Sequence, residues 1–280
     1  MGNINSRVTV VAEIGWNFMG NLLLAEEMIR AAQRAGADIC KFQYWDPACL
    51  KPGLWDSDGR RDIYQDAKLD EGKISTLSSI CSEVGVGFLL SVFSLKGAEF
   101  IQSIGQTAIK IPSHEAYNTP LYEYAVENFS TVYASLGACT EQELDAVARV
   151  YEGRSKGVQK FNAMHCVSAY PCAVDHLNLN RIQALQERFD EVGFSDHSAS
   201  LVSGAVAVGI GCRVVEKHFT TDNQLPGRDN QFALTEEKFR QFVDNIREAT
   251  AMKIDRGVSY QEIEHDVVEN YRGRWALGES

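Results

Sequence analysis

The sequence contains no long apolar run and no cluster of basic residues. Its hydrophobic stretches fall short of the roughly 18 residues that a membrane-spanning helix needs. Acidic residues outnumber basic ones, 38 to 27, giving a formal net charge of −11. No Lys/Arg run interleaves with aromatic residues, so nucleic acid and anionic membranes are not expected as partners. To bind an anionic ligand, this acidic chain would need several basic side chains close together at the binding site.

The number and spacing of the cysteines match neither a disulfide framework nor a zinc site. The seven cysteines are an odd number, are scattered, and never occur as CxxC. Most lie inside apolar segments, which favours reduced thiols in a core over disulfides. The first residues lack the apolar segment of a secretory signal peptide. These features predict a soluble, non-exported protein located in the cytoplasm.

Short β-rich apolar runs alternate with amphipathic helical stretches along the chain. This alternation is typical of parallel strands joined by crossover helices. Eight units can be counted, which predicts an α/β protein with a (β/α)8 TIM barrel, a fold of about 250 residues. We expect strands at 8–14, 38–42, 87–91, 108–111, 131–135, 160–165, 191–195 and 213–217. We expect helices at 22–35, 70–84, 95–104, 119–128, 140–152, 178–190, 199–209 and 235–251, with Thr140 and Thr235 as N-caps.

The predicted barrel occupies residues 1–252, and a C-terminal helical tail occupies residues 253–280. The tail contains one more expected helix, at about 260–271. A long segment at 44–69, rich in Asp, Gly and Trp, follows the second strand. Long loops in compact domains are often functional, so this segment is a candidate lid.

Polar residues end nearly every expected strand. In such barrels the chemistry takes place at the carboxyl ends of the strands. Charged groups are rarely buried unpaired because their desolvation is costly, so these residues need partners or a ligand. Their convergence on one rim predicts a site. The polar residues at the strand ends are Glu13, Asn17, Lys41, Gln43, Ser91, Lys110, Ser113, Glu115, Ser135, His165, Ser168, Ser195, Asp196, His197, Glu216, Lys217 and His218. His114, His176 and His265 are interpreted as surface or loop residues.

His197 and His218 end neighbouring strands, whose axes lie about 4.8 Å apart, so both imidazoles could reach one divalent cation. Asp196, Glu216 and Asp229 are candidates for further ligands or for partners of the ligands. Such a set suits Mn²⁺, Fe²⁺, Co²⁺ or Zn²⁺ better than Mg²⁺. The alternative is that each histidine is a hydrogen-bonded residue of the rim.

Lys41 and Lys110 end strands two and four, with serine hydroxyls on the same arc. Two ammonium groups and hydroxyl donors predict a receptacle for a small anion such as a phosphorylated carboxylate. Alternatively, the lysines form structural ion pairs with Glu13 and Glu115, or one of them forms a Schiff base. Glu13 and Glu115 are the candidate acid/base groups, and the residues alone do not decide between them.

The strand-end residues fall within runs that resemble the N-acetylneuraminate (sialic acid) synthase family. The runs are 11–15 (VAEIG), 35–43 (AGADICKFQ), 110–115 (KIPSHE), 136–137 (LG), 164–166 (MHC), 170–171 (YP), 194–197 (FSDH), 216–219 (EKHF) and 226–229 (PGRD). The resemblance implies an enzyme that condenses phosphoenolpyruvate with N-acetylmannosamine or a related aldose, giving a nonulosonic acid. It also implies a divalent metal cofactor, most often Mn²⁺ with Mg²⁺, Co²⁺ or Zn²⁺ as alternatives, and a homodimer.

The resemblance also implies roles for single residues. It assigns Lys41, Ser91, Lys110, Ser113, Ser135 and Ser195 to phosphoenolpyruvate, and His197 and His218 to the metal. It places Glu13, Gln43, Glu115, Tyr170 and Asp229 near the sugar or the reacting water. Glu115 is the hypothesised base, and Glu13, Lys41 and Lys110 complete the catalytic set.

Several positions depart from the family pattern. Phe18 and Met19 stand where polar residues are usual, Ser168 replaces an asparagine, Leu136 replaces a threonine, and His114 replaces a glycine. Most members also carry a small antifreeze-like domain that contributes an arginine to the partner subunit's sugar site. This chain stops about where the linker to that domain would begin, so the acceptor is left open.

Two other functions are consistent with the same residues. One is a metal-dependent barrel aldolase or hydrolase in which His197 and His218 serve a different reaction. The other is a non-catalytic barrel that binds a sugar acid or a protein partner, because a fold alone does not guarantee activity.

Overall fold

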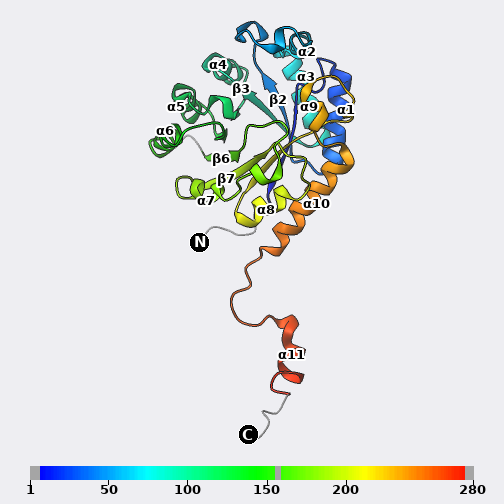
Figure 1. Ribbon diagram of the computed structural model, residues 1–280, viewed down its shortest axis with the longest axis vertical. Helices are drawn as coiled ribbons and strands as arrows, with labels where there is room; N and C mark the ends of the chain where they lie inside the picture. The colour runs from blue at the N-terminus through cyan, green and yellow to red at the C-terminus, as the bar shows by residue number, and fades with distance from the viewer. Residues whose placement is uncertain (1–6, 155–158, 275–280) are drawn as a thin grey trace.

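Eight parallel strands close into a barrel in the computed structural model, which describes residues 7–154 and 159–274 (Figure 1). The strands follow one another around the barrel in chain order, and β1 pairs with β8. The (β/α)8 prediction is therefore confirmed. The strands are β1 (Thr9–Gly15), β2 (Ile39–Tyr44), β3 (Gly87–Val92), β4 (Ala108–Ile111), β5 (Thr131–Ser135), β6 (Lys160–Cys166), β7 (Glu191–Asp196) and β8 (Val214–His218).

Helices surround the barrel and cover the outer faces of the strands (Figure 1). They are α1 (Leu22–Arg34), α3 (Glu71–Val84), α4 (Leu95–Ser103), α5 (Thr119–Asn128), α6 (Glu141–Glu152), α7 (Arg181–Gln186), α8 (Ser203–Ile210) and α10 (Glu236–Met252). The helices predicted at 178–190 and 199–209 are shorter than expected. Asn178 has a left-handed φ of 45°, which a right-handed helix cannot contain. The amides of Val202 and Ser203 donate to Ser200 Oγ and so form a turn at 200–203. α8 therefore begins only at the end of this turn.

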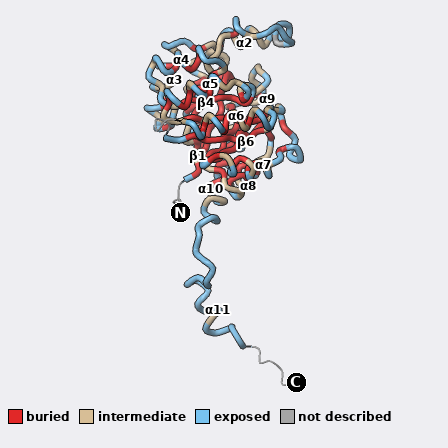
Figure 2. Tube along the Cα trace, turned by 90° about the vertical axis from the view of Figure 1, so that its left-hand side faces the viewer, coloured by how far each residue is buried: buried red, intermediate tan, exposed pale blue. Residues whose placement is uncertain are grey.

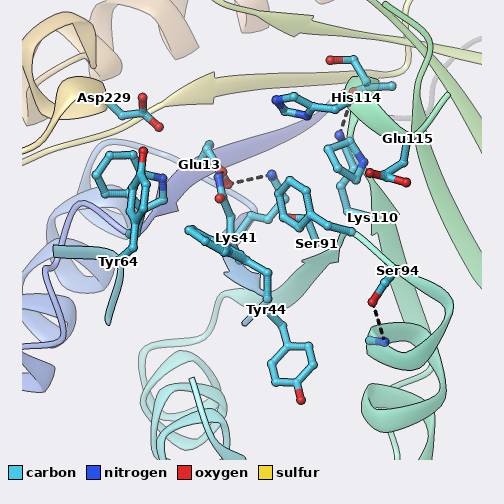
Figure 3. Close-up of a pocket in the computed structure, with 18 of the residues that line it drawn as sticks. Glu13, Lys41, Tyr44, Tyr64, Ser91, Ser94, Lys110, His114, Glu115 and Asp229 are labelled. Atoms are coloured by element: carbon cyan, nitrogen blue, oxygen red, sulfur yellow. Dashed lines mark hydrogen bonds and ion pairs between the residues drawn. The ribbon is translucent and has the colours of Figure 1, made fainter. Parts of the chain in front are cut away.

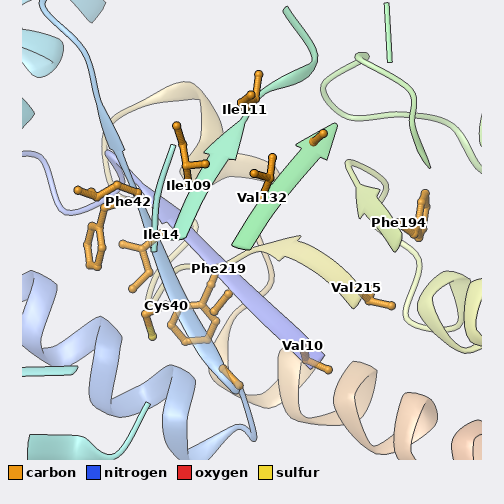
Figure 4. Close-up of a cluster of buried hydrophobic side chains, with 14 of the residues drawn as sticks. Val10, Ile14, Cys40, Phe42, Ile109, Ile111, Val132, Phe194, Val215 and Phe219 are labelled. Carbon is orange, nitrogen blue, oxygen red and sulfur yellow. The ribbon is translucent and has the colours of Figure 1, made fainter. Parts of the chain in front are cut away.

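Side chains on each strand alternate between the barrel interior and the helical layer. Outward-facing residues such as Val10, Phe42, Phe194 and Val215 pack beneath the helices and form the main apolar core (Figure 4). Inward-facing Val11, Met164 and Val214 form a smaller interior cluster. Polar interior residues lie on the same strands, nearer their carboxyl ends. Strand alternation therefore places the apolar layer under the polar site.

The segment at 44–69 is folded into short helices. It contains η1 (Pro47–Cys49), η2 (Leu54–Asp56) and α2 (Arg60–Ala67), which lie at one end of the barrel (Figure 1). Gly20 has a φ of 78°, and a Cβ atom there would lie 2.2 Å from the Asp66 carbonyl oxygen. Only glycine permits this close approach, which ties the end of α2 to the loop after β1.

The C-terminal residues run away from the barrel (Figures 1 and 2). The predicted helix at 260–271 consists of two short pieces, η5 (Glu262–Glu264) and α11 (His265–Asn270). Nearly every residue from 251 to 274 is exposed. The domain boundary at 252 stays a prediction. In the described part of the chain, no helix is both long and apolar enough to cross a membrane.

The two predicted N-caps provide a matched test of helix capping. Thr140 accepts from the Glu143 amide in a capping box at α6, whereas Thr235 makes no side-chain cap bond at α10. We expect Thr140→Ala to cost about 1 kcal/mol and to lower Tm by roughly 2–4 °C. Thr235→Ala should change Tm much less. Equal effects in thermal melts of the two variants would contradict this assignment.

Candidate active site

A cavity of about 1020 Å³ opens at the carboxyl ends of the strands. Residues from β1, β2, β3, β4, β5, β7 and β8 and from their following loops line it. Five of the strand-end residues do not line it, so their predicted place in the site is wrong: Asn17, His165, Ser168, Asp196 and Lys217. All of the residues to which the resemblance assigns a role do line it, and those roles stay predictions. They are Glu13, Lys41, Gln43, Ser91, Lys110, Ser113, Glu115, Ser135, Tyr170, Ser195, His197, His218 and Asp229.

Two buried lysines and two buried carboxylates form the floor of the cavity. Lys41 Nζ lies 2.7 Å from Glu13 Oε2 and 3.5 Å from Glu216 Oε1. Lys110 Nζ lies 3.8 Å from Glu216 Oε2 and donates to Ser135 Oγ at 2.7 Å. Glu216 therefore lies between the two ammonium groups. Figure 3 shows Glu13 and Lys41 in the middle of the cavity.

The pKa values of these four buried groups shift in different directions. Burial by itself lowers the pKa of Lys41, but Glu13 and Glu216 outweigh it and the net shift is upward. Burial lowers the pKa of Lys110, whose carboxylate partner is farther away. Glu216 resists the upward effect of burial because both lysines face it, and its pKa falls. Glu13 has a raised pKa, caused first by burial and opposed by Lys41.

Glu216 is the floor residue whose role the sequence reasoning missed. The sequence predicts it only as a metal ligand or as a partner of one, whereas its carboxylate contacts both lysines and accepts from Ser195 Oγ at 2.9 Å. Strand alternation could have found it, because Val214, Glu216 and His218 occupy alternate positions of one strand. Of the alternative lysine pairings, that of Lys41 with Glu13 is present, whereas pairing with Glu115 is wrong, since Glu115 accepts from Asn118 instead.

The two predicted histidines lie side by side on the wall of the cavity, with ring centres 5.6 Å apart. His197 Nδ1 lies 2.8 Å from the Val167 carbonyl oxygen, so Nδ1 carries the hydrogen and Nε2 keeps a free lone pair. Burial lowers the pKa of His197 to about 4 and that of His218 well below its ordinary value. Both rings are therefore neutral at pH 7.

The His218 side chain has one ring nitrogen that is buried without a partner. Its buried Nδ1 has no hydrogen-bond partner and lies 3.8 Å from Asp229 Oδ2. Burial raises the pKa of Asp229 to about 7. Among residues 7–154 and 159–274, no group of three or more His, Cys, Asp or Glu side chains is arranged to hold a metal ion. The chain thus offers two imidazoles with one carboxyl group nearby.

Asp196 does not line the cavity, so the suggestion that it is a further metal ligand there is wrong. Its side chain points to the outer side of the strand, where it pairs with Lys217 at 2.6 Å. Phe18 is also absent from the lining: it is fully buried and packs edge-on against Phe42 in the core. The departure at position 18 therefore alters the core and leaves the wall of the cavity unchanged.

An aromatic wall, which the sequence analysis did not anticipate, lines the mouth of the cavity. The ring of Tyr64 on α2 lies 4.6 Å from that of Trp16 and 4.9 Å from that of Trp45. Trp45 then contacts Phe93, whose ring lies 5.8 Å from His114. Tyr64 and Asp229 lie on the opposite side of the cavity from His114 and Glu115 (Figure 3). His114 is exposed as expected, lies in the short 3-10 helix η3 (Ser113–Glu115), and also lines the cavity.

The polar floor, the neutral histidine pair and the barrel architecture can be compared with known proteins. A model of the NeuB family matches residues 28–256. The chain belongs to the NeuB family. This confirms the resemblance inferred from the sequence runs, and the chain is an enzyme of the NeuB type.

Relatives of this NeuB chain cover most of its length. It is 32% identical to a pseudaminic acid synthase of Campylobacter jejuni, over 89% of this chain and 76% of the relative. It is 32% identical to an N,N'-diacetyllegionaminic acid synthase of Legionella pneumophila, over 86% of this chain and 71% of the relative. The crystal structure of an N-acetylneuraminic acid synthetase from Leptospira borgpetersenii in complex with citrate superimposes with a TM-score of 0.83. That match has 26% identity and covers 98% of this chain and 95% of the other.

The position of Glu216 predicts a strong dependence of stability on its charge. Glu216→Gln removes the carboxylate that both lysines face, and breaking a buried ion pair from one side costs about 3–5 kcal/mol. We therefore expect a large fall in Tm. Glu236→Gln, which breaks half-exposed pairs with Arg34 and Arg240, should have little effect. Similar melting curves for Glu216→Gln and the native protein would show that the lysines do not depend on this carboxylate.

Proposed function

We propose that this NeuB-type enzyme condenses phosphoenolpyruvate with N-acetylmannosamine or a related aldose, giving a nonulosonic acid and inorganic phosphate. The observation that carries the proposal is the pair of buried lysines, Lys41 and Lys110, on the floor of a cavity whose wall holds two neutral imidazoles. Relatives named for the synthesis of pseudaminic and N,N'-diacetyllegionaminic acids support this class of product.

The floor supplies what an anionic phosphate and carboxylate require. Charge-assisted N–H···O bonds have lengths of about 2.7–2.9 Å. The distances from Lys41 Nζ and Lys110 Nζ to Glu216 are 3.5 and 3.8 Å, so Glu216 makes a short charge-assisted bond to neither ammonium group. Both lysines can therefore direct N–H groups to a bound anion. Hydroxyls from Ser91, Ser113, Ser135 and Ser195 complete the proposed phosphoenolpyruvate site.

The proposed reaction forms a C–C bond and a new C2–O bond from water, and it breaks the C2–O bond to phosphate. C3 of phosphoenolpyruvate attacks the aldehyde carbon, and the aldehyde oxygen takes up a proton to become a hydroxyl group. Water then adds to the cationic C2 and loses a proton to a base. The second proton of that water leaves as C2 becomes a ketone and phosphate departs.

Glu115 is the proposed base for the water. Its carboxylate lines the cavity and accepts from Asn118 Nδ2 at 2.8 Å, which orients it. Burial raises its pKa above the ordinary value, which makes the carboxylate a stronger base. Glu13 is held differently, between Lys41 Nζ and the amide of Gln43. We assign it to binding and orientation.

A divalent metal, Mn²⁺ in our proposal with Mg²⁺, Co²⁺ or Zn²⁺ as alternatives, would be held by His197 and His218. The fit rests on two neutral rings with centres 5.6 Å apart and on the buried, unpartnered Nδ1 of His218. A bound metal would supply Lewis acidity toward the aldehyde oxygen. The homodimer and the cytoplasmic location stay predictions.

Release of inorganic phosphate tests the proposed reaction. Metal-stripped protein is incubated with phosphoenolpyruvate and a panel of aldoses, with and without Mn²⁺. We expect release that requires an aldose, is restored by the metal, and is abolished in His218→Ala. Release without an aldose would indicate a hydrolase, and a keto acid formed from pyruvate would indicate an aldolase. Binding of phosphoenolpyruvate with no release from any aldose would favour a binding role.

The role of Glu115 predicts a specific dependence on pH. A base must be deprotonated, so kcat/KM should rise with pH through the pKa of Glu115. Because burial raises this pKa, the acidic limb should lie above the ordinary glutamate value of about 4.3. Glu115→Gln should lower kcat by about 10²- to 10⁴-fold with little change in KM for phosphoenolpyruvate. An unchanged kcat would exclude Glu115 as the base.

A further inference from the structure

The ends of β7 and β8 carry a second buried ion pair, on the outer side of the barrel wall. Lys217 Nζ lies 2.6 Å from Asp196 Oδ2, and the two side chains are 2% and 0% exposed. Neither residue lines the cavity, and the proposed reaction uses neither. A fully buried ion pair next to an active site, but outside it, calls for a physical explanation.

The pair belongs to a hydrogen-bond network without unpaired groups. Lys217 Nζ donates to Asp196, to Ser198 Oγ at 3.4 Å and to the Ser200 carbonyl at 3.1 Å. Asp196 also accepts from the Ser198 amide at 2.8 Å and from Ser203 Oγ. The network therefore joins the end of β7, the turn before α8 and the end of β8.

The network lies directly behind the two imidazoles. Asp196 and Lys217 are partners in the register of β7 and β8. Each is followed in sequence by one of the histidines. Because side chains alternate along a strand, the ion pair faces outward while His197 and His218 face the cavity. The contact between Asp196 and Lys217 thus joins the two residues that directly precede the histidines.

Stability alone does not explain this pair. Replacing a buried ion pair by apolar side chains is often neutral or stabilising, and the better-attested role of such pairs is to select one arrangement. Besides these polar partners, Lys217 Nζ lies 5.0 Å from the centre of the Phe242 ring on α10. The two charges therefore select one arrangement of the strand ends, which apolar packing alone would not do.

We propose that Asp196 and Lys217 are positioning residues that fix the separation and orientation of the His197 and His218 imidazoles. The part of this inference that concerns metal affinity rests on the proposed function. The part that concerns the position of the rings does not.

The test is the double variant Asp196→Asn/Lys217→Met, which removes both charges and leaves no buried charge unpaired. Its Tm should fall less than that of Asp196→Asn or Lys217→Met alone, because each single variant leaves one buried charge unpaired. Its affinity for Mn²⁺, measured by competition with a chelator, should fall about 10- to 100-fold, as for other residues that orient metal ligands. In turnover, kcat should fall while KM for phosphoenolpyruvate changes little, because Lys41 and Lys110 are untouched.

A matched control breaks an ion pair at the opposite end of the barrel. Arg247 Nη2 lies 2.7 Å from Asp38 Oδ2, next to the first residues of β1 and β2. Asp38→Asn/Arg247→Met should leave Mn²⁺ affinity unchanged. Lys217→Arg is the second variant, used if the double variant does not fold. It keeps the charge but replaces the ammonium by a planar fork, and it should still lower Mn²⁺ affinity about tenfold.

A measurement on the metal-free protein separates the positioning role of the ion pair from the proposed metal site. In the metal-free native protein, the His197 Nδ1–H bonded to the Val167 carbonyl should give an exchange-protected signal in ¹⁵N-histidine spectra. We expect this signal to be lost or shifted in the charge-removed variant. If it is lost but the native protein binds no Mn²⁺, the positioning role stands and the proposed metal site fails. If a folded variant keeps both the signal and the native Mn²⁺ affinity, the positioning role is overturned.

Discussion

Closure of the sheet by β1 and β8 is the constraint on which the site depends. In their register Glu13 faces His218, although 205 residues separate them in the chain. In the next pair Ser195 faces Glu216, and across β1 and β2 Glu13 faces Lys41. An open sheet would leave β1 and β8 at opposite edges. The lysine floor and the histidine wall would then lie apart, with no common cavity.

Burial in that closed barrel determines the electrostatics. The same loss of solvent keeps both histidines neutral and raises the pKa values of Glu115 and Asp229. Glu216 is the exception because two ammonium groups face its carboxylate. A chain with a net charge of −11 thus concentrates positive charge at one place and balances it there. The second ion pair, behind β7 and β8, is balanced in the same way but serves the wall of the barrel.

Much of this arrangement could be predicted from local sequence because charged residues within apolar strand segments are conspicuous. Lys41, Lys110 and His218 were found in this way, and all three line the cavity. Asp196 is wrongly predicted as a ligand, and strand alternation corrects this, because the residue before the inward-facing His197 faces outward. Tyr64 and Trp45 were not anticipated because they come from the segment at 44–69, whose path depends on contacts such as that between Gly20 and Asp66.

The sequence by itself determined the order of strands and helices, the closed-barrel class and the set of polar strand ends. These properties follow from hydrophobic periodicity and residue chemistry, which are local. Tertiary structure alone decided that Glu216 lies between two lysines, that Lys217 pairs outward with Asp196, and that Glu115 accepts from Asn118 and pairs with neither Lys41 nor Lys110. Those outcomes depend on strand register and on distances between residues far apart in the chain. Periodicity along one strand carries no information about either.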